Sequence, residues 1–192
     1  MASRKVFISS RIKEMENERD AVESVFVNLR EKENINFISW RLEKESKTIP
    51  SAKSPDVVQS ENLKESDIYL LILGSEYGRK KGMSPTHKEY NEALFEIDKD
   101  CILIYAKNDE DTVQKRDERL KKWIEEMRET RTCKPFKNVE ELKIFVKNRL
   151  RHLWYEKFEK GVSKRGSGLD KSDMTSDDSH THLVEALHKL RR

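Results

Sequence analysis

Cysteine is scarce in this 192-residue sequence, which contains only Cys101 and Cys133. Neither belongs to a C-x-x-C pair, so the usual pattern of a structural zinc site is missing. Cys101 opens an apolar segment, and we expect it to be a small core residue. Three histidines near the C-terminus also lack an acidic or thiol frame at ligand spacing, namely His180, His182 and His188. We therefore predict no metal site.

Long apolar runs are also absent, and none approaches the roughly 20 residues that a transmembrane helix needs. The first ten residues, MASRKVFISS, lead directly into a strand-like segment and contain no apolar leader. We therefore expect a cytoplasmic protein with reduced thiols and no membrane partner. Glycine is limited to six residues, and no G-x-G-x-x-G fingerprint occurs, which excludes a Rossmann dinucleotide-binding turn.

Charge of a single sign is not in excess, although charged residues make up 39% of the chain against 35% hydrophobic residues. An average globular domain has roughly 25% charged residues. The 39 basic and 36 acidic residues give a net charge of +3, and the two signs are interspersed. We interpret this pattern as a solvated surface, and we do not expect nucleic acid as a partner.

Short apolar runs alternate with amphipathic stretches along most of the chain. The runs predict strands at residues 5–10, 35–40, 67–74, 101–106 and 132–136. Apolar residues at helical spacing predict helices over residues 12–29, 55–63, 85–97, 113–127 and 139–153. This alternation predicts an α/β fold with a doubly wound parallel sheet of about five strands.

The composition changes after residue 160. Residues 161–180, GVSKRGSGLDKSDMTSDDSH, carry too few apolar side chains to form a core, so we predict a flexible polar tail. Leucines at helical spacing in residues 182–192 favour a short terminal helix. The predicted organisation is a domain over residues 1–160 and a tail over residues 161–192.

Four blocks of the sequence resemble the TIR-like domain-of-unknown-function family 4062. The blocks are VFISSRIKEMENER, SPDVVQSENLKESDIYLLILGSEYG, SPTHKEYNEA and CILIYAK, which occur in this order between about Lys5 and Lys107. The resemblance implies a flavodoxin-like (TIR-like) sheet with strand order 2-1-3-4-5. It also implies a role in signalling or defence, as a homo-oligomer or with a TIR-like partner.

Glu89 is the catalytic candidate that this resemblance implies. Catalytic TIR relatives cleave the nicotinamide–ribose bond of NAD with a glutamate in the helix after the third strand, and Glu89 occupies the matching place. NAD or another nucleotide would then be the substrate, with no further cofactor required. A carboxylate can stabilise or trap the oxocarbenium character that develops when an N-glycosidic bond breaks.

The alternative for Glu89 is a helix cap. Thr86 and Glu89 fit the T-x-x-E capping box, in which the glutamate bonds back to the first residue of the helix. Ser84 followed by Pro85 offers a competing helix start that would free the Glu89 carboxylate. His87 lies between these positions and could assist proton transfer, or it could be a solvated residue of the first turn.

Ligand-binding candidates gather where strands are predicted to end. Ser9, Ser10 and Arg11 follow the first strand, where hydroxyls and amides can bind an anion, although Ser10 could instead cap the next helix. Arg19 occupies an apolar slot of the first helix, and the family pattern also has Glu-Arg there. Its guanidinium suits phosphate or carboxylate, but its stem could equally cover the core edge.

The loop after the third predicted strand supplies further candidates. Gly74 and Gly78 permit close backbone approach, and Tyr77 could stack on a base or ribose. Trp40, at the end of the second strand, could stack on a ring in the same way. The alternatives are turn geometry with an aromatic plug at Tyr77 and a core-edge role for Trp40. A non-catalytic interaction and oligomerisation module is the alternative function for the whole chain.

Overall fold

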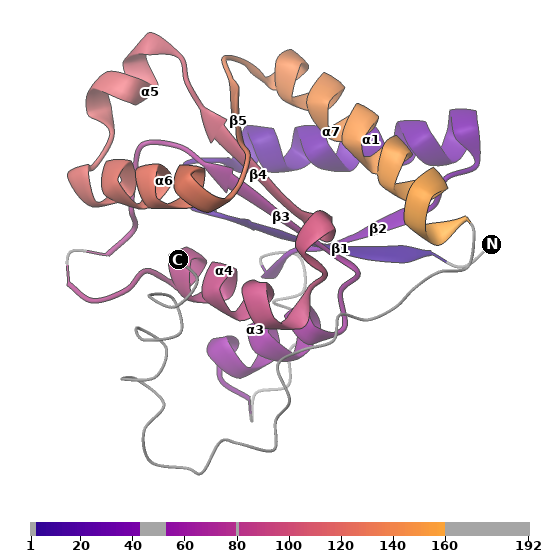
Figure 1. The fold of residues 1–192 in the computed structure, drawn as a ribbon, viewed down its shortest axis with the longest axis horizontal. Coiled ribbons are helices and arrows are strands. Elements are labelled where there is room, and N and C mark those ends of the chain that lie inside the picture. Colours follow the sequence, from indigo (N-terminus) through magenta and orange to yellow (C-terminus); the bar gives the residue numbers. More distant parts are fainter. Residues whose placement is uncertain (1–2, 43–52, 80, 160–192) are drawn as a thin grey trace.

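Five parallel strands form the central sheet in the computed structural model, which describes residues 3–42, 53–79 and 81–159 (Figure 1). Their order across the sheet is β2-β1-β3-β4-β5, which confirms the predicted flavodoxin-like topology. Strands β1 to β4 come from runs rich in apolar and β-branched residues, whereas β5, CKPF, buries only its first and last residues. The bounds are β1 Arg4–Ser10, β2 Phe37–Trp40, β3 Ile68–Leu73, β4 Ile102–Lys107 and β5 Cys133–Phe136.

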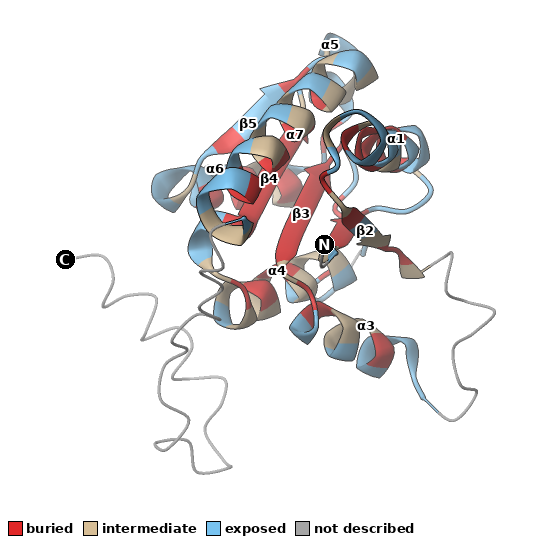
Figure 2. Cartoon of the chain, turned by 90° about the vertical axis from the view of Figure 1, so that its right-hand side faces the viewer, coloured by how far each residue is buried: buried red, intermediate tan, exposed pale blue. Residues whose placement is uncertain are grey.

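Helices cover both faces of this sheet. Helices α1 and α7 pack together on one face, and α3, α4 and α6 lie on the other (Figures 1 and 2). The helices are α1 Glu16–Glu33, α3 Pro55–Lys64, α4 Pro85–Glu96, α5 Glu110–Lys115, α6 Glu118–Thr130 and α7 Val139–Leu153. A 3-10 turn, η1 Lys99–Cys101, precedes β4, and a π-helical turn, η2 Trp154–Phe158, follows α7.

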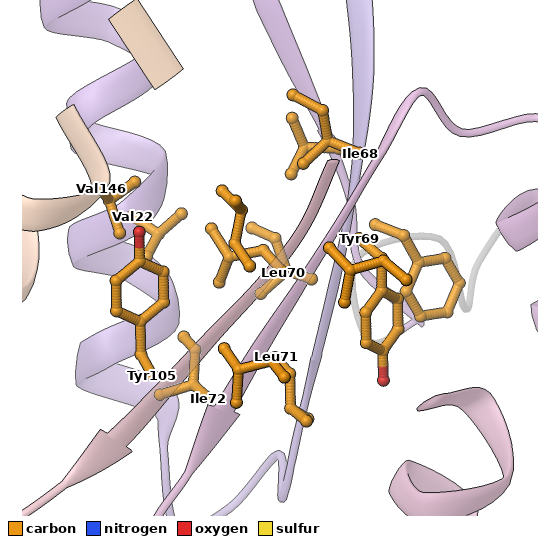
Figure 3. Packing of buried hydrophobic residues seen from close by; sticks show 14 of the residues in the cluster. Val22, Ile68, Tyr69, Leu70, Leu71, Ile72, Tyr105 and Val146 are labelled. Atoms are coloured by element: carbon orange, nitrogen blue, oxygen red, sulfur yellow. The ribbon is translucent and has the colours of Figure 1, made fainter. Parts of the chain in front are cut away.

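The core is centred on β3, in which all six residues are buried (Figure 2). Because side chains alternate along a strand, Tyr69 and Leu71 point to the α4 face and their neighbours point to the α1–α7 face. Figure 3 shows Val22 of α1 and Val146 of α7 on that second side, together with Tyr105 of β4. Each of these large apolar side chains contributes about 1.5–3 kcal/mol when it is fully buried.

Two of the predicted helices differ from the structure, one in its start and the other in its continuity. Helix α1 starts at Glu16, so Ile12 lies in a preceding turn and is exposed. The predicted helix over residues 113–127 is divided into α5 and α6, because Arg116 has an extended backbone between them. The Arg116 guanidinium donates to the carbonyls of Gly74 and Lys107, and Asp117 caps α6. These tertiary hydrogen bonds outweigh helix continuation at this point.

Several predictions concern residues outside the described ranges. The tail over residues 161–192, its terminal helix and His180, His182 and His188 all lie there. Within the described ranges, no group of three or more His, Cys, Asp or Glu side chains is placed to hold a metal ion. No helix in the same ranges combines the length and apolar character required to cross a bilayer. Cys101 is buried, as expected of a core residue.

Gly74, immediately after β3, is a position where a side chain would clash. A Cβ atom there would lie 2.6 Å from Glu14 Cδ and 2.7 Å from Met15 Sδ, and closer still to Glu14 Oε1. Glu14 Oε1 accepts hydrogen bonds from the Ser75 amide and hydroxyl, so the carboxylate cannot move without losing them. We expect Gly74→Ala to lower the free energy of unfolding by about 2 kcal/mol in urea titration.

The matched control for this prediction is a double-mutant cycle with Glu14→Ala. Removing the carboxylate relieves the closest contact, so Gly74→Ala should cost at least about 1 kcal/mol less in that background. Equal losses in the two backgrounds would show that the Glu14 contact is not the cause.

Candidate functional site

Helix α4 begins at the position that leaves Glu89 outside the cap. Ser84 is the N-cap, its hydroxyl accepts a hydrogen bond from the His87 amide at 3.2 Å, and Pro85 is the first helical residue. Thr86 is therefore inside the helix, and no capping box forms between Thr86 and Glu89. The helix start places Glu89 in the second turn, on the side that faces the sheet.

Ser9 binds the Glu89 carboxylate directly. Its hydroxyl donates to Glu89 Oε2 over 2.5 Å, a contact between residues 80 positions apart in the sequence. Ser9 lies near the carboxyl end of β1 and points to the α4 face of the sheet. Within the described part of the chain, Ser9 is the only hydrogen-bond donor to this carboxylate, and Oε1 accepts no hydrogen bond. One oxygen of Glu89 is thus fixed, and the other has no hydrogen bond from the described residues.

The environment makes the charged form of Glu89 less favourable than it is in water. Burial is the largest factor, and it raises the pKa of the carboxyl group. The hydrogen bond from Ser9 and the charge of Arg19 act in the opposite direction, whereas Glu92 and Asp56 add to the rise. Part of the residue surface remains exposed, but the carboxyl group itself lies deep in the fold. A carboxylate with a raised pKa is a stronger base than one in water.

Tyr69 brings an unexpected polar group to the same place. Its hydroxyl is buried and has no hydrogen-bond partner among the described residues, the only buried side-chain atom there of which this is true. Burial raises the pKa of Tyr69, the charge of Glu89 adds to the rise, and Ser9 opposes it. These influences place the Tyr69 hydroxyl close to the Ser9–Glu89 pair.

We expect Tyr69→Phe to leave the free energy of unfolding unchanged or to raise it by about 1 kcal/mol. The ring remains packed, and a buried hydroxyl without a partner is lost rather than a formed hydrogen bond. Tyr77→Phe is the matched control, because the Tyr77 hydroxyl bonds to His87 Nδ1 at 2.8 Å. That variant should lose about 1 kcal/mol in the same urea titration. A loss of similar size for Tyr69→Phe would contradict the prediction.

Arg19 and Ser10 meet on the opposite face of the sheet. The Arg19 side chain is almost fully buried, and its Nη1 donates to Ser10 Oγ at 2.8 Å and to the Ile8 carbonyl at 3.1 Å. Ser10 therefore holds Arg19 rather than capping a helix, since α1 begins at Glu16. Arg19 reaches Glu89 only through its charge, which favours the ionised carboxylate.

The loop after β3 is held close to the end of β1. Arg11 forms an exposed ion pair with Glu76, with 2.9 Å between Nε and Oε2. Gly78 has a φ of 98°, a conformation that side chains disfavour, and a Cβ there would lie 3.4 Å from Arg11 Cδ. Gly74 supports the same loop through its close approach to Glu14. Candidate residues that follow β1 and β3 thus lie together at the carboxyl edge of the sheet.

Tyr77 lies in an aromatic cluster that joins this loop to α4 and α6. His87 stacks on Trp123 at a centroid distance of 4.1 Å, Tyr77 packs edge-on against both rings, and Arg119 lies over the Tyr77 ring at 4.1 Å. Burial lowers the pKa of His87 to about 4, with a contribution from Arg119, so the ring is neutral at pH 7. The neutral ring can accept the Tyr77 proton.

Trp40 lies on the same face of the sheet as Glu89. It is buried and stacks on Phe7 at a centroid distance of 4.7 Å, and Phe7 in turn packs beside Tyr69 at 5.9 Å. The row of three rings connects β2 to the tyrosine next to Glu89. In this arrangement Trp40 supports the site through Phe7.

The sequence did not single out Tyr69 or the ion pair between Glu18 and Lys107 at the carboxyl edge of the sheet. Tyr69 could have been noticed as the one polar-tipped residue in an aliphatic strand. Glu18 is buried in an ion pair with Lys107 at 2.9 Å, and nothing in its local pattern separates it from the exposed glutamates of α1. The ion pair joins two segments that are far apart in the sequence.

The comparisons with known proteins agree with this architecture. A family model described as "Domain of unknown function (DUF4062)" matches residues 5–151. The match extends through β5 and most of α7, beyond the segment over which the sequence blocks were compared. Among curated proteins, none matches the sequence significantly.

Proposed function

The chain belongs to the family of domains of unknown function described as DUF4062, and from that premise we propose that it hydrolyses the N-glycosidic bond of a nucleotide, with NAD as the substrate. The supporting observation is the Glu89 carboxylate, which has one oxygen held by Ser9 at 2.5 Å and the other oxygen without a protein hydrogen bond in the described residues. The role of Glu89 is carried over from the resemblance to TIR enzymes.

The proposed reaction needs only water as a second reactant. The bond between ribose C1′ and the nicotinamide nitrogen breaks, and its electron pair leaves with neutral nicotinamide. The positive charge that develops on the ribose is stabilised by the Glu89 carboxylate. Water then attacks C1′ and gives a proton to Glu89, whose raised pKa suits it as a base. ADP-ribose and a proton are the remaining products.

The hydrogen bond from Ser9 serves this reaction by fixing the carboxylate. A glutamate side chain on a helix has several rotamers, and one short hydrogen bond selects the orientation that presents Oε1. Arg11 is the nearby cation that can contact a phosphate, because its ion pair with Glu76 is exposed and exchanges at little cost. Ser10 and Arg19 then support the sheet edge from the other face.

A role in signalling or defence is part of the proposal and rests on the resemblance alone. Activity that depends on assembly with a second copy would be consistent with that role. A rate of nicotinamide release that rises more steeply than protein concentration would support such an assembly.

The test is to incubate the purified chain with NAD and to follow nicotinamide release by chromatography. The assay covers a protein concentration series with and without a crowding agent, and Glu89→Gln is measured in parallel. The proposal predicts release by the wild type that the substitution removes. Release that persists in Glu89→Gln would overturn the assignment of Glu89. No release by the wild type under any condition would favour a non-catalytic interaction module.

A further inference from the structure

A basic groove lies at the opposite edge of the sheet from Glu89. It has a volume of about 780 Å³ and is bordered by α7 on one side and by the starts of β4 and β5 on the other. The positions of α7, β4 and β5 can be followed in Figure 1. Residues 102–105 of β4 form the floor of the groove. Residues 130–132, at the end of α6, also line it. The proposed NAD site does not share these residues.

Four cations line this basic groove, and three of them contact a backbone carbonyl or an aromatic ring. Arg149 Nη2 donates to the Asp100 carbonyl at 2.8 Å, and Arg131 Nη1 donates to the Lys99 carbonyl at 3.3 Å. Lys134 Nζ lies 4.4 Å from the centre of the Phe145 ring. None of the four, which are Lys99, Arg131, Lys134 and Arg149, forms an ion pair with a carboxylate of residues 3–42, 53–79 or 81–159.

Asp100 is the single carboxylate that lines the groove, and it is paired with a lysine outside the groove. Asp100 accepts from Lys157 Nζ at 2.9 Å, and this contact lowers the pKa of Asp100. Lys157 also pairs with Asp98. The charges of Lys99 and Arg149 lower the pKa of Asp100 further, so one carboxylate faces four cations at the groove. Like charges that converge without counter-ions repel one another, and an anionic ligand would relieve the repulsion.

The floor of the groove is apolar. Ile102, Leu103 and Tyr105 line it from β4, and Phe145 lines it from α7. Tyr105 lies on the same side of the sheet as Val146 of α7 (Figure 3). An apolar floor under a cationic rim suits a ligand that has both a flat ring and several negative charges.

We propose that the basic groove binds a nucleotide that carries two or three phosphates. Arginine forks bind phosphate oxygens in pairs, and two arginines with a lysine match a polyphosphate better than a single carboxylate. The volume lies within the roughly 300–1,000 Å³ of small-molecule sites, whereas a nucleic acid would need a longer basic stripe. This site is separate from the proposed hydrolytic site and does not depend on its activity.

The test is calorimetric titration of the full chain with ATP, with inorganic tripolyphosphate and with a 20-nucleotide single-stranded DNA. We expect ATP to bind with a Kd below about 1 mM at low salt, and more tightly than tripolyphosphate because the base contacts the apolar floor. Arg149→Ala should weaken ATP binding at least about 10-fold. Lys134→Gln, at an exposed strand position, is the second variant if Arg149→Ala fails to fold, and it should weaken binding several-fold.

Arg30→Ala is the matched control, because Arg30 is an exposed arginine on α1 that does not line the groove. It removes the same charge and should leave the Kd for ATP within 2-fold. Equal weakening by Arg30→Ala and Arg149→Ala would mean that net charge, and not the groove, attracts the ligand. Equal affinity for ATP and tripolyphosphate, or binding of DNA without binding of ATP, would overturn the assignment to a nucleotide.

Discussion

Glu89→Gln should reduce nicotinamide release from NAD by about 1,000-fold while it makes the fold more stable at pH 7. The amide keeps the size of the side chain and can still accept the Ser9 hydrogen bond, so the geometry is retained. It cannot stabilise a developing positive charge or take a proton from water, functions that contribute about 100- to 10,000-fold. Activity and stability are thus expected to change in opposite directions.

The stability half of this prediction follows from the sign of the pKa shift. The pKa of Glu89 is raised above the 4.5 that is ordinary for a glutamate, so the folded state disfavours the charged form. That penalty grows as the pH rises through 4.5 toward the folded pKa, and it is fully present above the folded pKa. Below pH 4.5 the carboxyl group is neutral in both states, and the variant and wild type should converge. The stability difference between the variant and the wild type should therefore widen as the pH rises from 4 to 8, and urea titrations across this range measure it.

Glu92→Gln is the control for the measurement of nicotinamide release. Glu92 lies one turn further along α4, where it accepts from Ser60 and lies near Lys64 rather than near Ser9. It should keep most of the nicotinamide release. If Glu89→Gln lost activity and also destabilised the fold at pH 7, the loss would reflect misfolding and the catalytic interpretation would fail.

The second large effect is acid destabilisation through His87. The pKa of His87 is lowered from 6.5 to about 4, chiefly by burial and also by Arg119, so the folded state favours the neutral ring. The resulting stability is fully present above pH 6.5 and is lost as the pH falls toward 4. Because His87 is only partly buried, solvent screening reduces the corresponding loss of stability between pH 7 and pH 4 to about 1–2 kcal/mol. The protonated ring would also lose the ability to accept from Tyr77.

His87→Phe isolates this contribution. Phenylalanine keeps the stacking on Trp123, so at pH 7 the variant should lose only the Tyr77 hydrogen bond, about 1 kcal/mol. Between pH 7 and pH 4 the free energy of unfolding of the wild type should then fall by about 1–2 kcal/mol more than that of the variant. His152→Gln, at an exposed histidine outside the aromatic cluster, is the control. Parallel curves for wild type and His87→Phe would refute the assignment.

The strand and helix order followed from the sequence because it rests on local patterns. The run DIYLLILG has no polar face, which is typical of a central parallel strand, and all six residues of β3 are buried. The pattern misled where a tertiary contact competed with it. Val113 continues the helical spacing of α6, but the Arg116 guanidinium is drawn to the Gly74 carbonyl, and the helix is broken there.

The candidate site was only partly predictable for a related reason. The sequence placed Glu89 near the carboxyl edge of the sheet, because a helix that follows a parallel strand starts there. It left two helix starts open, since Ser84 and Thr86 are both good caps and differ little in local energy. The helix starts at Ser84, and Ser9, 80 residues earlier, then meets the Glu89 carboxylate.

Sequence alone therefore determined the sheet, its helices and the neighbourhood of Glu89, because hydrophobic periodicity and connection rules act over short segments. Only the tertiary structure decided which polar groups meet: Ser9 with Glu89, Ser10 with Arg19, and Tyr69 with no partner among the described residues. Adjacent serines diverge because successive side chains of a strand point to opposite faces. Burial, which no local pattern encodes, then raises the pKa values of Glu89 and Tyr69.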